Sequence, residues 1–117
     1  MNIRLLSIFI FVCLIVSCAT PDELRQQTPL LNLKSNKPSK SVAICISDKW
    51  EGMGAFGGAL TVNMRPTKTG YVVSLPLNGQ TGMLVDIDDA GTGSTTKYYK
   101  GLVLLESELV EAIKSCQ

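Results

Sequence analysis

A nearly continuous apolar run at the N-terminus constrains this chain more than any other feature. Arg4 is the only charged residue before it, and residues 5–16 contain one polar residue, Ser7. A secretory signal peptide typically has a basic start, then about a dozen apolar residues, and a small residue before its cleavage site. The run is short for a transmembrane helix, which needs about 20 apolar residues. The sequence therefore predicts export with residues 1–17 cleaved; the alternatives are an uncleaved anchor or a buried helix.

The run ends in the motif Ile15-Val16-Ser17-Cys18, which resembles the lipobox of bacterial lipoproteins. In that family a diacylglyceryl group is attached to the cysteine sulfur, signal peptidase II cuts before the cysteine, and the new amine is acylated. The resemblance implies cleavage between Ser17 and Cys18 and a lipid on Cys18. Two or more acyl chains hold a protein stably on a membrane. The match covers the first 18 residues only.

The residue after the lipobox cysteine bears on sorting within the envelope. In the lipoprotein family an aspartate at this position tends to keep the protein in the inner membrane. The residue here is Ala19. The resemblance thus implies a lipid-anchored protein on the periplasmic face of the outer membrane.

Composition excludes several functional classes. Removing residues 1–17 leaves 100 residues, enough for one small domain, with ten basic and ten acidic side chains. The chain has no histidine, which excludes Ser-His-Asp and Cys-His catalysis and histidine metal sites. No basic stripe alternates with aromatic residues, so nucleic acid is not expected as a partner. We expect a protein that is not an enzyme and that has no metal site and no cofactor.

Two cysteines remain once Cys18 is lipidated and Cys13 is removed with the signal. They are Cys45 and Cys116. Because exported proteins fold in an oxidising compartment, this pair predicts a disulfide. In the chain-entropy description, closing such a loop stabilises the fold by about 4 kcal/mol. The alternative is two separate buried thiols.

The composition changes near residue 39. Residues 18–38 contain Pro21, Pro29 and Pro38 among many polar residues, which predicts a lipidated cysteine followed by a flexible tether. The alternative for the short apolar cluster at residues 30–33 is docking on the domain or on a partner. Residues 39–117 are expected to form a single small domain.

Periodicity within this domain predicts an α+β fold. Apolar residues at helical spacing predict helices over residues 39–51 and 106–115, and both cysteines lie on the apolar faces. Alternation predicts four strands between the helices, joined by short turns into an antiparallel meander. The expected order is helix, four-stranded meander, helix, in a two-layer sandwich with both helices on one sheet face. The strand ranges are 60–65, 71–77, 81–88 and 94–100.

Three motifs carry weak functional signals. Gly52, Gly54 and Gly57 form a G-x-G-x-x-G pattern, but a helix precedes it, whereas a dinucleotide site needs a strand there. The acidic run at residues 86–89 lacks the later ligands of a calcium loop. Tyr71, Tyr98 and Tyr99 could form an exposed patch for a partner, with cross-strand packing as the alternative.

These observations leave three functional hypotheses. The first is a membrane-anchored, non-enzymatic periplasmic module that binds an envelope protein or glycan. The second is an exclusion or inhibitor lipoprotein encoded by a phage or plasmid. The third is a hydrolase that uses the carboxylate of Asp86 or Asp88.

Overall fold

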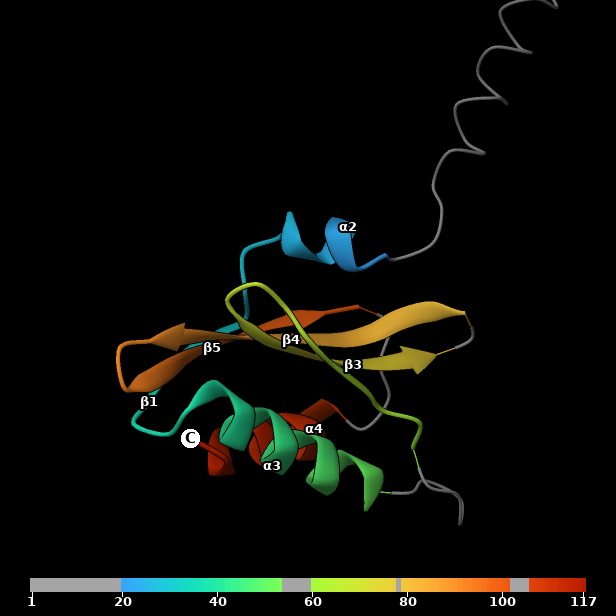
Figure 1. The fold of residues 1–117 in the computed structure, drawn as a ribbon. Coiled ribbons are helices and arrows are strands. Elements are labelled where there is room, and N and C mark those ends of the chain that lie inside the picture. Colours follow the sequence, from blue (N-terminus) through green and yellow to red (C-terminus); the bar gives the residue numbers. More distant parts are fainter. Residues whose placement is uncertain (1–19, 54–59, 78, 102–105) are drawn as a thin grey trace, which may run out of the picture.

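The computed structural model describes residues 20–53, 60–77, 79–101 and 106–117. The signal segment, Ser17, Cys18, and the glycines at 54 and 57 lie outside these residues. The described chain has α+β architecture, with a five-stranded sheet and three helices (Figure 1). In chain order the elements are α2 (Pro21–Arg25), β1 (Leu31–Ser35), α3 (Ser39–Glu51), β2 (Asn63–Pro66), β3 (Gly70–Leu77), β4 (Gln80–Ala90), β5 (Gly93–Lys100) and α4 (Glu106–Ser115).

The sheet has the strand order β1-β5-β4-β3-β2, and every neighbouring pair is antiparallel. Strands β2 to β5 form a meander as predicted, because each pairs with the next in sequence. The first of them begins at Asn63, whereas the sequence predicted a strand from residue 60. The expectation of four strands was wrong, since β1 adds a fifth at the β5 edge. Pro76 lies where the register of β3 on β4 shifts, and β2 pairs only with residues 71–74 of β3. The proline nitrogen therefore removes no hydrogen bond from the pairing with β2.

Strand β1 lies in the segment where composition predicts a flexible tether. Leu31 and Leu33 pack against the main core, while Asn32 and Lys34 are exposed. This alternation is that of a half-buried strand, and docking, the alternative for residues 30–33, is what the structure shows. At the neighbouring turn a side chain on Gly93 would meet the Ser35 backbone oxygen at 2.1 Å. Glycine at this position lets the chain leaving β1 approach the β4–β5 hairpin.

The two longer helices pack on one face of the sheet, as expected, and their bounds match the prediction (Figure 1). The core between α3, α4 and the sheet contains the fully buried Trp50 and Tyr98. The indole nitrogen of Trp50 donates a hydrogen bond to the Leu109 carbonyl at 3.0 Å. This bond joins the C-terminal end of α3 to α4 and pairs the one polar atom of a buried indole.

The short helix α2 lies on the opposite face of the sheet (Figure 1). Thr20 caps it by accepting a hydrogen bond from the Glu23 amide, and Pro21 occupies its first turn. Leu24 is 2% exposed and packs on three sheet residues, forming a small second core: Val72, Leu84 and Tyr99. The sequence predicts helices on one face only. The structure has a partial third layer, formed by α2, which lies in the segment before residue 39.

Candidate functional site

The predicted disulfide is present between Cys45 of α3 and Cys116 just after α4. Their Cα atoms lie 5.7 Å apart although the residues are 71 positions apart in sequence. Cys116 is fully buried in the main core. The disulfide joins α3 to the end of α4 within the core, so we assign the pair a structural role.

The three tyrosines do not form the predicted partner patch. Tyr98 is 1% exposed and points toward the helices, whereas Tyr99 is 8% exposed and belongs to the small core under α2. Tyr71 is partly buried against the main core. Successive residues of a strand point to opposite faces, so Tyr98 and Tyr99 cannot share one surface. Packing within the fold, the alternative interpretation, accounts for them.

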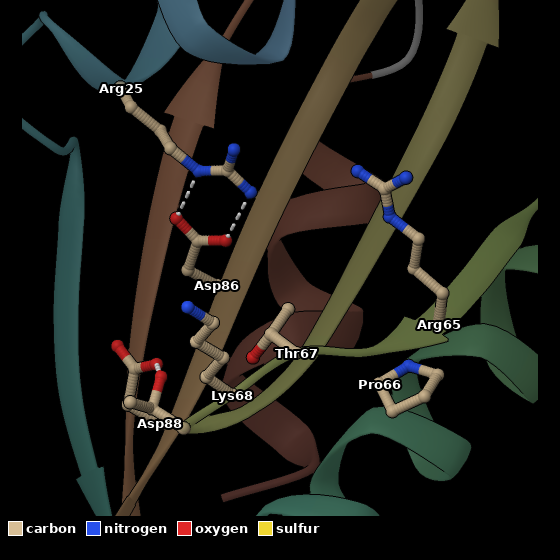
Figure 2. Close-up of a pocket in the computed structure, with 8 residues that line it drawn as sticks. Arg25, Arg65, Pro66, Thr67, Lys68, Asp86 and Asp88 are labelled. Carbon is tan, nitrogen blue, oxygen red and sulfur yellow. Dashed lines mark hydrogen bonds and ion pairs between the residues drawn. The ribbon is translucent and has the colours of Figure 1, made fainter.

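Asp86 is held by an arginine that lies 61 positions earlier in the sequence. Arg25, the last residue of α2, donates from Nε to Asp86 Oδ2 at 2.8 Å and from Nη2 to Oδ1 at 2.9 Å (Figure 2). The side chains are 31% and 17% exposed. Hydrogen bonding to Asp86 raises the pKa of Arg25, so the guanidinium stays charged. This bidentate pair fixes α2 on β4 and occupies both carboxylate oxygens.

Asp88 also has a partner, on the β2–β3 turn. Its Oδ1 accepts a hydrogen bond from the Thr69 hydroxyl at 2.6 Å. Asp86 and Asp88 lie on the sheet face opposite α3 and α4, as alternation predicts. Each carboxylate of the hydrolase hypothesis is thus already bound to a neighbour within the fold.

A shallow hollow of about 480 Å³ opens beside the Arg25–Asp86 pair (Figure 2). The turn between β2 and β3 closes one side of it, and Arg65 stands across it from Arg25. Its lining is polar and mixes both signs of charge: Arg25, Arg65, Pro66, Thr67, Lys68, Thr69, Asp86 and Asp88. A site of this kind suits a charged, hydrated ligand better than an apolar one.

Basic side chains extend this polar surface across the sheet. The strand register places Arg65, Val72, Asp86, Lys97 and Asn32 in one row over all five strands. Lys34 belongs to the same face, because it pairs with Thr95 of β5 and Thr95 pairs with Asp88. Within the described part of the chain, four basic residues of this face form no ion pair: Lys34, Arg65, Lys68 and Lys97. We call this surface, with Arg25, the basic face.

The described residues contain no cluster of three or more Cys, Asp or Glu side chains that could hold a metal ion. None of the helices described is both long enough and apolar enough to cross a membrane.

Sequence reasoning missed the basic face because two of its members come from segments that it treated separately. Arg25 lies in the segment expected to be a tether, and Arg65 lies at the end of the first strand predicted for the meander. The sequence does predict a turn of helix over residues 22–27, with Thr20 or Asp22 as its cap, and the structure has α2 there with Thr20 as the cap. The sequence pattern did not indicate that this helix docks on the sheet, which is what brings Arg25 to Asp86.

We expect the Arg25–Asp86 pair to contribute a coupling energy of about 1 kcal/mol, the upper end for exposed pairs, because it is bidentate and partly buried. A double-mutant cycle with Arg25→Ala and Asp86→Ala, followed by urea denaturation, measures it. Arg25→Lys is the matched control, since it keeps the charge but loses the fork geometry. Additive effects of the two alanine substitutions would contradict this expectation.

We expect stability to fall at alkaline pH because of Tyr98. Burial, and then the nearby negative charge of Glu106, raises the pKa of Tyr98 above its ordinary value. A raised pKa means that the fold favours the neutral phenol. The contribution of the neutral Tyr98 phenol to the free energy of unfolding is therefore intact below about pH 10. Above that pH it declines by up to about 1.4 kcal/mol per pH unit. Urea denaturation from about pH 8 to pH 11 measures the slope, and Tyr98→Phe should remove this part of it. Equal slopes in both proteins would refute the assignment.

Comparison of the chain with models of protein families, with curated protein sequences and with solved structures finds no match.

Proposed function

We propose that this protein is a membrane-anchored lipoprotein that acts as a non-enzymatic binding or accessory module of the bacterial envelope. Cys18 carries the lipid, and the module faces the periplasm from the outer membrane. The anchor is supported by the lipobox-like motif, and the exported location is supported by the Cys45–Cys116 disulfide.

The observation that favours binding over catalysis is the state of the carboxylates on the basic face. Asp86 is bound by Arg25 through both oxygens, and Asp88 accepts a hydrogen bond from Thr69. A general acid or base must exchange protons with a substrate. Within the described residues, four side chains of the basic face form no ion pair, and two of them, Arg65 and Lys68, line the hollow, which favours an anionic component of the envelope as the ligand.

Fractionation of cells that produce the wild-type chain or Cys18→Ser tests the anchor. The wild-type protein should appear in the outer-membrane fraction and the variant should leave it, because the variant has no cysteine at the lipobox position to accept a lipid. Cys45→Ala with Cys116→Ala is the matched control, since it removes two cysteines and should keep the protein in the membrane. Wild-type protein in the soluble fraction would refute the proposal.

Complementation with Asp88→Asn and with Arg65→Glu separates the binding hypothesis from a hydrolase that uses Asp88. If deletion of the gene has a phenotype, Asp88→Asn should complement it, because the carboxylate has no chemical role in a binding module. Arg65→Glu should fail to complement it, since it reverses a charge on the basic face. The opposite pattern would favour the hydrolase.

A further inference from the structure

We propose that the basic face lies against the membrane that anchors Cys18 and that its arginine and lysine side chains contact the phosphate groups of anionic lipids. This inference rests on the proposed lipid anchor, and it names the ligand of the basic face.

The point of attachment lies on this side of the molecule. Thr20 caps α2, and α2 lies on the sheet face opposite α3 and α4 (Figure 1). Consecutive Cα atoms are 3.8 Å apart, so the Cα of Cys18 lies at most about 8 Å from that of Thr20. The lipid must therefore leave the protein close to α2, with the sheet separating it from α3 and α4.

Helix α2 is fixed to the sheet, so it does not act as a free linker. Leu24 is 2% exposed among Val72, Leu84 and Tyr99, and Arg25 holds Asp86 through two hydrogen bonds. A linker of about 20 flexible residues would have a root-mean-square reach of about 25 Å and leave the orientation open. With two residues between the lipid-bearing cysteine and a docked helix, the α2 side is the side held near the bilayer.

The distribution of charge favours the same orientation. The strands and turn of the basic face carry Lys34, Arg65, Lys68 and Lys97 against Asp86 and Asp88, and Arg25 offsets Asp86. Helix α2 adds two exposed acids, Asp22 and Glu23, of which Asp22 lies 3.5 Å from Arg25. On the far side, helices α3 and α4 carry three lysines and five acids. Lys37, Lys100 and Asp89 contact residues of that side, so acids outnumber bases there by one. Each basic residue near an anionic bilayer raises the association constant about fivefold, so the orientation in which the basic face meets the bilayer is favoured.

A single reporter on each side of the molecule tests the orientation. Lys68→Cys places a thiol on the basic face, and Ile44→Cys places one on α3, where Ile44 is 40% exposed. In each variant the introduced cysteine would be the only free thiol once Cys18 is lipidated and Cys45 and Cys116 are paired. The lipidated chain is labelled with a fluorophore and reconstituted in vesicles containing headgroup nitroxide lipids, with either phosphatidylcholine alone or an added fraction of phosphatidylglycerol.

We expect several-fold stronger quenching at position 68 than at position 44, and a larger ratio in the phosphatidylglycerol vesicles. Arg65→Glu with Lys97→Glu should lower the ratio there, whereas Lys40→Glu with Lys49→Glu on α3 should not. Raising the salt concentration should lower the ratio between the two reporters in the same way, which provides a test without charge reversal. The proposal is overturned if quenching is equal at the two positions or stronger at position 44. It is also overturned if the ratio does not change when phosphatidylglycerol is added.

Flotation of the vesicles that contain phosphatidylcholine alone, which offer the basic face no anionic lipid, separates this inference from the proposed function. A chain without lipid does not float, and then the anchor and the orientation both fail. A chain that floats but leaves position 68 unquenched keeps the anchor and overturns the orientation alone. In that case the basic face is open to a periplasmic glycan or protein.

Discussion

Replacing Cys45 and Cys116 with alanine is expected to lower the free energy of unfolding by about 4 kcal/mol. The disulfide closes a loop with a sequence separation of 71, and a crosslink over that length restricts the unfolded chain strongly. Small domains are stable by only about 5–15 kcal/mol, so this is a large share of the total. Urea denaturation followed by the fluorescence of Trp50, the only tryptophan, measures the loss.

Reduction of the wild-type protein provides the control for this experiment. It breaks the same bond without changing the core, so reduced wild-type protein and the double variant should unfold at similar urea concentrations. Alanine is preferred over serine because Cys116 is fully buried, and a hydroxyl there would add the cost of an unpaired polar group. A double variant within about 1 kcal/mol of the oxidised protein would show that the bond contributes little.

Trp50→Ala is expected to destabilise the fold by about 3–5 kcal/mol, the range for removing a large aromatic side chain from a core. Trp50 is fully buried, and its indole nitrogen donates to the Leu109 carbonyl across the α3–α4 contact. Trp50→Phe keeps an aromatic ring but loses the hydrogen bond, so it should cost distinctly less than the alanine variant. Far-UV circular dichroism in urea measures both. Equal losses in the two variants would mean that ring packing contributes little beyond the hydrogen bond.

The domain from residue 39 onward could be predicted well from local sequence signals. Alternation placed Met83, Val85 and Ile87 of β4 on the core side, and helical spacing put Cys45 and Cys116 where they can pair. These predictions succeeded because each depends on the period of one element and on burying its apolar face.

The docking of α2 on the sheet and the addition of β1 to its edge could not be predicted in the same way. Leu31 and Leu33 alternate over five residues only, and three prolines surround them, so composition suggested a tether. Their strand forms because the edge of β5 offers unpaired backbone groups, which is a tertiary effect that the local pattern does not contain. The basic face was missed for the same reason, since Arg25 meets Asp86 only after α2 docks.

The position of α2 matters for the proposed function as well as for the fold. A tether would let the module turn freely above the membrane, whereas a docked helix next to the anchor restricts it. In our account the sheet separates a membrane side, with α2 and the basic face, from α3 and α4. The side with α3 and α4 then faces the periplasm and is the surface available to envelope proteins.

The intact mass of membrane-extracted protein tests in one measurement whether Cys18 carries lipid while Cys45 and Cys116 are paired. We expect a chain that starts at Cys18, is heavier by a diacylglyceryl group and a further acyl chain, and gains two hydrogens on reduction. An unlipidated chain, or one that retains Met1, would contradict the anchor. A mass unchanged by reduction would contradict the disulfide.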